Sequence, residues 1–167
     1  MIEIVVHGRG GQGAVTFAIM LAKAAGLEGK WVQAFPAFGV ERRGAPVRAF
    51  CRIDKKPITQ RTQVYKPDWA VVLDESLIES GVVKIDGAKV VINSKKDYPN
   101  CSSFDATAVA LDILGKPIVN TAMLGFFAHV SKLVRLDSLL KSLEDIFSGK
   151  LLELNKRLVS EAYERAA

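Results

Sequence analysis

The sequence predicts an α/β fold: a three-layer α/β/α sandwich in which a mostly parallel sheet lies between helices, with a helical C-terminus. From residue 2 to residue 119, short apolar runs of strand length alternate with segments whose apolar residues recur every three or four positions. From residue 121 onward the spacing is helical throughout. The 167 residues, 49% of them hydrophobic, suit one core, so we expect a single domain over residues 1–167.

The predicted strands are short and mostly apolar. They cover residues 2–7, 31–35, 45–53, 69–74, 88–93 and 118–119. The third strand alternates apolar residues with Arg48, Phe50 and Arg52, which predicts one solvent-facing or partner-facing side. Residues 54–56 follow it and can turn the chain into a short hairpin arm.

The predicted helices follow from apolar residues at helical spacing. They cover residues 14–27, 106–114, 122–134, 138–147 and 150–165. Asp105 and Asp137 stand where N-caps are expected, and Gly115 with Pro117 should end the helix at residues 106–114.

The composition excludes several classes of protein. No run approaches the roughly 20 apolar residues of a membrane span, so we expect no membrane partner. Cys51 and Cys101 are far apart without a CxxC, so this chain alone cannot assemble a zinc site or an iron–sulfur cluster. His7 and His129 belong to no hydrolase or metalloprotease motif. We expect a cytoplasmic protein with no metal site and no catalytic residues of its own.

The positive charge is concentrated in one segment. The net charge is +5, from 23 basic and 18 acidic residues, but residues 42–66 hold eight of the basic residues and one acid. That segment therefore carries +7 and the remainder −2. This placement favours a local anion site or an acidic partner surface over nucleic acid, because aromatic residues do not interleave the segment in the way that a base-stacking platform requires.

A glycine-rich turn follows the first strand and opens the first helix, as in a Rossmann-like βα unit. The turn matches G-x-G-x-x-G and consists of Gly8, Arg9, Gly10, Gly11, Gln12 and Gly13. Glycine permits a tight turn and a close approach, and the helix start directs free amides at an anion. These six residues are candidates for holding an anionic cofactor or a partner subunit.

Other interpretations of this turn remain open. A dinucleotide site needs an acid at the end of the second strand to hold a ribose, and residues 32–36 carry none. A P-loop needs Lys and then Ser or Thr, where this chain has Ala14 and Val15. Alternatively, the glycines only let the first helix pack tightly on the sheet. Asp74 and Glu75, after a later strand, suit either an acid–base pair or the start of a helix.

The most unusual stretch is FPAFGVERRGAP at residues 35–46, where paired arginines stand between two glycines and two prolines. Polar loops of this kind are often functional. The guanidinium groups can bind phosphate, cross a subunit interface or form an internal ion pair. The candidate residues here are Phe38, Gly39, Glu41, Arg42, Arg43 and Gly44.

Three motifs in order carry a resemblance that covers nearly the whole chain. HGRGGQGAVT at residues 7–16, FGVERRGAPVRAF at 38–50 and NTAMLG at 120–125 resemble the gamma subunits of pyruvate and related 2-oxoacid:ferredoxin oxidoreductases. The second motif is most similar to the pyruvate and 2-oxoisovalerate branches. The third adds Asn120 and Met123 to the candidates, and we expect it beside the glycine turn, after a strand at residues 118–119.

The resemblance implies a subunit of pyruvate synthase or a related complex. Such a complex decarboxylates a 2-oxoacid on thiamine diphosphate, sends electrons through 4Fe-4S clusters to ferredoxin and passes the acyl group to coenzyme A, reversibly. It implies alpha, beta and delta partner subunits that bind thiamine diphosphate, Mg and the clusters, because this chain has no thiamine diphosphate motif and no cluster cysteines. No cofactor is then bound by this chain alone.

The resemblance also gives the candidate residues a place. The glycine turn and residues 38–46 would face the core subunits near the active-site entrance, where they either hold an anionic part of coenzyme A or fix the interface. Two other classes of function stay open: a freestanding nucleotide-binding or sensing domain, and a basic adaptor for nucleic acid.

Overall fold

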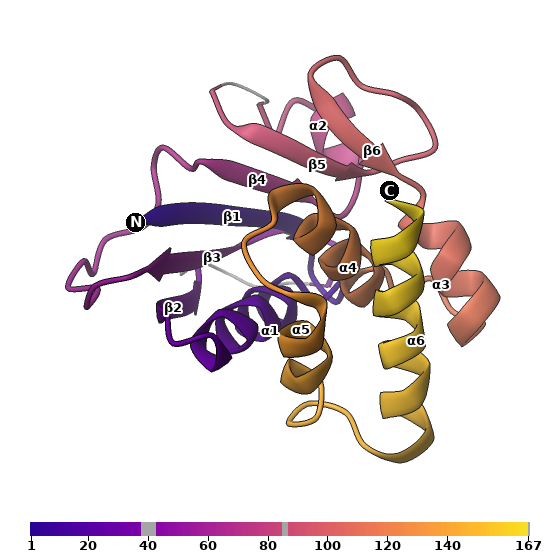
Figure 1. Cartoon of the computed structure of the whole chain (residues 1–167). Coiled ribbons are helices and arrows are strands. Elements are labelled where there is room, and N and C mark those ends of the chain that lie inside the picture. Colours follow the sequence, from indigo (N-terminus) through magenta and orange to yellow (C-terminus); the bar gives the residue numbers. More distant parts are fainter. Residues whose placement is uncertain (38–42, 85–86, 167) are drawn as a thin grey trace.

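The computed structural model describes residues 1–37, 43–84 and 87–166. In chain order the elements are β1 (Ile2–Arg9), α1 (Ala14–Leu27), β2 (Trp31–Pro36), β3 (Pro46–Asp54), β4 (Trp69–Val72), α2 (Ser76–Glu79), β5 (Lys89–Asn93), β6 (Cys101–Phe104), α3 (Ala106–Leu114), α4 (Asn120–Ser131), α5 (Leu136–Ser142) and α6 (Gly149–Arg165) (Figure 1). α1 and α3 have the predicted bounds, and Asp105 caps α3 through a bond from the Ala108 amide at 2.9 Å.

The described strands form a six-stranded sheet in the order β2-β3-β1-β4-β5-β6. β1, β4, β5 and β6 pair in parallel, whereas β3 runs antiparallel to both of its neighbours, β1 and β2. The predicted, mostly parallel sheet is confirmed. Below, the carboxyl edge is the end of the sheet at which β1 and β4 finish, and the amino edge is the end at which they begin.

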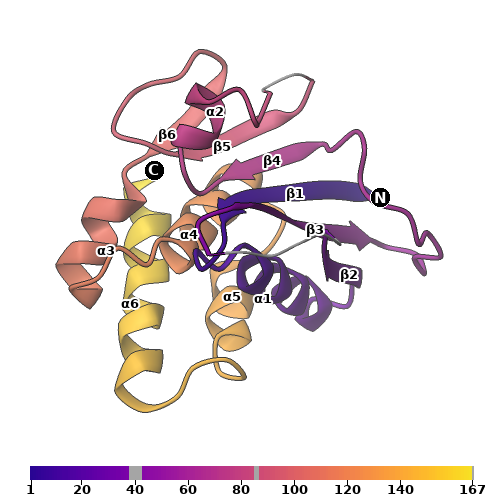
Figure 2. The ribbon, with the colours of Figure 1, turned by 180° about the vertical axis from the view of Figure 1, so that it is seen from behind.

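Helices lie on both faces of the sheet, but unequally (Figures 1 and 2). α1 and α3 to α6 cover one face, where their apolar side chains form the larger core cluster with β-strand residues such as Ile4 and Val6. The other face is covered by the short α2 and by irregular chain, in a smaller cluster that includes Phe50, Val72 and Leu77. The predicted three layers are confirmed, and one is thin because the connections after β3 and β4 contain little helix.

The third sequence motif contributes to packing inside the thick layer. A Cβ at Gly125 would overlap the carbonyl oxygen of Val159, so glycine is what lets α4 and α6 approach this closely. Met123, two residues earlier in α4, is fully buried. Within NTAMLG, Gly125 therefore permits the close contact of α4 with α6, and Met123 lies in the core.

The prediction that β3 has one solvent-facing or partner-facing side is wrong at its centre. Phe50 and Arg52 are 0% and 1% exposed. The irregular segment at residues 60–64 crosses over them, and its Val64 joins the same apolar cluster as Phe50. Residues 55–60 form no strand, so the hairpin arm is absent as well. Alternation alone could not reveal a covering segment that lies later in the chain.

The remaining errors concern short elements and helix ends. Residues 118–119 form no strand, because Val119 already has helix-like backbone angles and α4 begins directly after it. The sequence pattern does not predict β6, because its sequence, Cys-Ser-Ser-Phe, has little apolar character. An edge strand of the sheet needs fewer apolar side chains than a central one. α5 is shorter than predicted and starts earlier, so Asp137 lies in its first turn rather than at the N-cap.

Arg52 is a buried charge that ties the covering segment to the sheet. Its Nε donates to Glu3 Oε1 at 2.7 Å, and Nη1 donates to Gln33 Oε1 at 3.1 Å. Nη2 donates to the carbonyl oxygens of Thr62 at 2.7 Å and Gln63 at 3.3 Å. The guanidinium group therefore satisfies acceptors on β1, β2 and residues 62–63 at once, which is the condition for burying such a group.

We expect Arg52→Met to lower the free energy of unfolding by about 2 to 4 kcal/mol, because Glu3 loses its charged partner and two carbonyls lose a donor. The matched control is Arg48→Met, which removes an exposed guanidinium from the same strand and face and should cost less than about 1 kcal/mol. Urea denaturation of the purified chain measures both variants. Equal losses would contradict the anchoring role of Arg52.

Candidate carboxyl-edge site

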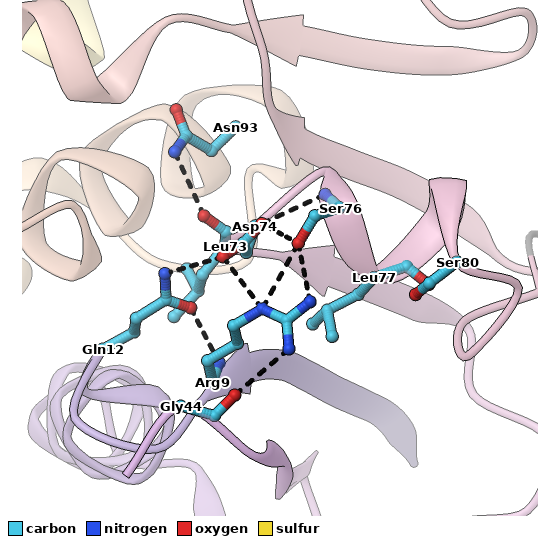
Figure 3. Close-up of polar contacts among 9 residues, drawn as sticks. All are labelled: Arg9, Gln12, Gly44, Leu73, Asp74, Ser76, Leu77, Ser80 and Asn93. Carbon is cyan, nitrogen blue, oxygen red and sulfur yellow. Dashed lines mark hydrogen bonds and ion pairs between the residues drawn. The ribbon is translucent and has the colours of Figure 1, made fainter.

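The predicted site motifs meet at the carboxyl edge of the sheet. β1 leads through the glycine turn into α1, and β4 ends beside β1 before Asp74 and α2. β3 runs in the opposite direction and therefore begins at this edge, directly after residues 43–45. Figure 3 shows how side chains from these segments converge.

Arg9 connects the three segments. Its Nη2 donates to Ser76 Oγ at 2.8 Å, and its Nη1 donates to the carbonyl oxygen of Gly44 at 3.1 Å. Its Nε donates to Ser76 Oγ at 3.2 Å and lies 3.4 Å from Asp74 Oδ2 (Figure 3). Each guanidinium nitrogen of Arg9 already has a partner within the chain. Arg9 therefore links the three segments and has no pair of free nitrogens with which to bind a phosphate.

Asp74 is held as an ionised carboxylate by its neighbours. Partial burial alone would raise its pKa, but the bonds from the Ser76 hydroxyl (2.6 Å) and amide (3.0 Å), from Gln12 Nε2 (3.0 Å) and the charge of Arg9 keep the pKa below its ordinary value. Gln12 in turn accepts from the Arg9 amide at 2.7 Å. Of the two interpretations of Asp74, this geometry favours the start of a helix over an acid–base group.

The glycine turn is paired with the second motif through the backbone. The Gly10 amide donates to the Ala45 carbonyl at 2.8 Å, and the Gly44 amide donates to the Gly10 carbonyl at 3.1 Å. Gly10 also forms a bridge with Arg43. The two motifs, far apart in sequence, are therefore direct neighbours. Four candidates of the second motif lie outside the described residues: Phe38, Gly39, Glu41 and Arg42.

Two glycines of the turn adopt left-handed backbone conformations, Gly11 with φ +93° and Gly13 with φ +79°. A Cβ at position 11 would meet no atom within 4 Å, whereas a Cβ at position 13 would overlap the side-chain amide of Asn120. Asn120 Nδ2 lies 3.5 Å from the Gly13 carbonyl oxygen. The third motif thus lies beside the glycine turn as expected, although Asn120 begins α4 rather than following a strand. Met123 lies in the core and not at this edge.

The start of α1 has the electrostatics of an anion site. No side chain caps this helix, and its first turn holds no acid. Asn120 is only 5% exposed, and its Oδ1 has no hydrogen-bond partner among the described residues. Since a helix N-terminus carries unsatisfied amides and a positive partial charge, the backbone here can stabilise a negative group without a basic side chain.

A hollow of about 360 Å³ lies next to the turn, at the ends of β4 and β5. Its lining includes the carboxylates of Asp74, Glu75 and Asp105, against the single ammonium of Lys95. Glu75 also accepts bonds from Ser94 and Tyr98. This excess of negative charge does not suit an anion, so the anion-compatible part of the edge is the turn itself.

His7 lies just before the turn and does not add a positive charge there. Burial, and next the nearby charge of Arg48, lower its pKa from 6.5 to about 4. The imidazole is therefore neutral at physiological pH. It cannot act as a cation toward a phosphate.

The interpretation of residues 42–66 as one local charge site is wrong. Arg43 lies at the carboxyl edge, Arg52 is buried in the sheet, and Lys55 lies past the end of β3 at the amino edge. β3 has nine residues and so spans about 30 Å. The excess positive charge is divided between opposite edges, and the antiparallel direction of β3 places Arg43 at the carboxyl edge.

Sequence reasoning also missed Ser76, which bonds to both Arg9 and Asp74. The sequence does contain a pattern that indicates this contact. A Ser two residues after an Asp at a strand end is typical of a turn in which the Asp side chain accepts from the backbone. In residues 1–37, 43–84 and 87–166, no three His, Cys, Asp or Glu side chains are grouped so that they could hold a metal ion. None of the helices in those ranges is long and apolar enough to cross a membrane.

The fold and this edge define an α/β protein in which a glycine turn opens an uncapped helix at the carboxyl edge of a mostly parallel sheet. Residues 3–165 match the family model described as pyruvate ferredoxin/flavodoxin oxidoreductase. The chain belongs to this family.

Individual relatives agree over nearly the full length. The chain is 52% identical to the common subunit gamma of the pyruvate/ketoisovalerate oxidoreductases of Pyrococcus furiosus, over 99% of this chain and 97% of that protein. It is 56% identical to pyruvate synthase subunit PorC of Methanocaldococcus jannaschii, over 98% and 96%. The crystal structure of pyruvate oxidoreductase subunit PORC from Thermotoga maritima matches with a TM-score of 0.83 at 37% identity, over 98% of this chain and 95% of that one.

These comparisons confirm the predicted resemblance to the gamma subunits. They also confirm the prediction that the chain is a subunit of an oxidoreductase complex rather than an enzyme that acts alone. The alternative of a freestanding nucleotide-binding domain gains no support.

The two left-handed glycines make a matched pair for testing the turn. We expect Gly11→Ala to cost about 1 kcal/mol of unfolding free energy, from backbone strain alone, because the space around it is open. Gly13→Ala should cost about 2 to 3 kcal/mol, since strain is joined by the overlap with Asn120. In an Asn120→Ala background the excess cost of Gly13→Ala should shrink. Chemical denaturation of the four variants measures this coupling, and additive losses would contradict the contact.

Proposed function

We propose that the chain is the gamma subunit of a pyruvate:ferredoxin oxidoreductase, a pyruvate synthase, assembled with alpha, beta and delta subunits. The observation that carries this proposal is identity of 52% and 56%, over at least 98% of the chain, to proteins named as such subunits. The whole chain, residues 1–167, acts as one gamma-type domain. The partners bind thiamine diphosphate, Mg and 4Fe-4S clusters, and coenzyme A is the co-substrate of the complex.

Within that complex, the carboxyl edge contributes binding and not chemistry. Arg9, Gln12 and Asp74 hold the glycine turn against the start of β3, so the first amides of α1 keep a fixed direction. A fixed helix start with no acid in its first turn suits an anionic part of coenzyme A or an acidic group of a partner subunit. Arg43, beside Gly10, adds a guanidinium group to the same edge.

The test of the activity is purification of the tagged chain from its native extract. We expect it to co-purify with larger subunits and to show coenzyme A-dependent reduction of ferredoxin with a 2-oxoacid. A panel of pyruvate, 2-oxoisovalerate and 2-oxoglutarate identifies the substrate, and we expect pyruvate to give the highest kcat/KM. A monomeric chain that retains a nucleotide would overturn the proposal.

Charge reversal of Arg42 and Arg43 separates the two roles of the edge. If the edge holds coenzyme A, the doubly Glu-substituted complex should assemble normally and its KM for coenzyme A should rise about tenfold or more. If the edge fixes the interface, the subunit should instead dissociate during gel filtration. Lys141→Glu/Lys150→Glu, two exposed sites on α5 and α6, is the control of equal charge change. An intact complex with unchanged coenzyme A dependence would exclude both roles.

A further inference from the structure

The two outermost strands of the sheet, β2 and β6, differ in how they are protected from pairing with another chain. β6 has only four residues. β2 has six residues, none of them charged, and it lies at the outer edge of the sheet beside α1 (Figure 1). Short strands and charged side chains are usual means of preventing an edge strand from binding a further strand. β2 lacks both, and its one proline, Pro36, stands at the last position of the strand.

The register of β2 shows which of its backbone groups face away from β3. The Ala37 amide, directly after β2, donates to the Arg48 carbonyl at 2.9 Å. In an antiparallel pair, residues that bond to the neighbouring strand alternate with residues whose backbone groups face away from it. Val32 and Ala34 therefore direct their amides and carbonyls outward, and among the described residues no backbone group bonds to them from that side. Pro36 also falls at an outward position, where a missing N–H disturbs no bond to β3.

A groove of about 700 Å³ runs beside the same strand, between β2, α1 and α5. Val32 and Ala34 line it from β2, and Ile19 and Leu27 line it from α1. Ile19 is 41% and Leu27 58% exposed. Exposed apolar side chains that gather along a groove are typical of a surface that another protein covers.

The charges around this groove are mostly compensated within the chain. Lys23 pairs with Asp145, and Glu144 pairs with Lys156 at 2.8 Å. The remaining charged lining residue, Lys141, is exposed on α5. The groove therefore suits apolar side chains better than charged ones.

We propose that the outer side of β2 and this groove bind an extended, apolar segment of another subunit of the complex, which adds a strand to the sheet. The inference rests on the proposed function, which supplies the partner subunits. Free amides and carbonyls two residues apart match the backbone of a strand, whereas a helix satisfies its own. Since alternate side chains of a strand point to one face, every second residue of the segment enters the groove. Backbone bonds then give affinity, and the groove selects the apolar side chains.

The same geometry disfavours a second copy of this chain as the occupant. The added strand must turn one face into the groove. In this chain, the corresponding face of β2 already packs against the thick helical layer: Val32 lies 3.8 Å from the position of a Cβ at Gly26 in α1, and Ala34 contacts the larger core cluster. The occupant must instead be a segment with both faces free before it binds, such as an extended tail or loop of a partner.

Hydrogen exchange at single-residue resolution tests the added strand directly. In the isolated chain, the amides of Val32 and Ala34 should exchange about tenfold or more faster than those of Gln33 and Phe35, which face β3. In the assembled complex, exchange at Val32 and Ala34 should slow about a hundredfold or more, and the difference from Gln33 and Phe35 should disappear. A segment of another subunit should become protected in the same experiment, which identifies the occupant.

Ala34→Pro removes one outward amide and leaves the bonds to β3 intact. We expect its affinity for the other subunits to fall about tenfold or more, while the urea midpoint of the isolated chain stays close to that of the unaltered chain. Ala34→Ser keeps the amide and is the matched control, so its affinity should change less than about twofold. Leu27→Lys places a charge in the groove and should also weaken assembly, whereas Leu151→Lys, at an exposed site on α6, should not.

An intact complex in which the Val32 and Ala34 amides stay unprotected would overturn the proposal, and so would normal assembly of Ala34→Pro. Protection that appears in the isolated chain as its concentration rises would make a second copy the occupant and would also overturn it. If the tagged chain co-purifies with no other subunit, the proposed function itself fails. An active complex with an unprotected β2 leaves that function standing and removes only the added strand.

Discussion

The carboxyl edge depends on the ion pair and hydrogen bonds of Arg9. β1 and β4 are parallel neighbours, so their last residues fall side by side, and the guanidinium group spans the gap to Asp74 and Ser76. Its bond to the Gly44 carbonyl adds the loop before β3. Partly buried charged groups bind strongly when every donor has a partner. Together with the backbone bonds between Gly10 and residues 44–45, this side chain therefore fixes where the glycine turn, α2 and the start of β3 lie relative to each other.

Arg52 plays the corresponding structural role at the other end of β3. Arg9 and Arg52 both project onto the thin side of the sheet, where irregular chain takes the place of helices. Irregular chain brings carbonyl oxygens that no helix satisfies, and a buried guanidinium can satisfy several of them at once. The thin layer is thus built from loops held by arginine, in contrast to the thick layer, where α4 and α6 meet through Gly125.

The sequence predicted the fold well because its signals were local. α1 and α3 follow from helical spacing and cap residues, and the glycine turn follows from its position between β1 and α1. Long-range effects were not predictable: the burial of Arg52 depends on residues 60–64, and the end of NTAMLG turned out to be a packing contact with Val159. The engagement of Arg9 by Ser76 required knowing that β4 pairs with β1.

The direction of β3 has the largest functional consequence. Because β3 is antiparallel, it carries the chain from the carboxyl edge to the amino edge. Arg43, before the strand, and Lys55, after it, therefore lie at opposite edges of the sheet. A parallel strand would also divide the charge, but with Arg43 at the amino edge and Lys55 at the carboxyl edge. The antiparallel direction instead places Arg43 at the carboxyl edge, beside the backbone amides of the glycine turn, and Lys55 at the amino edge.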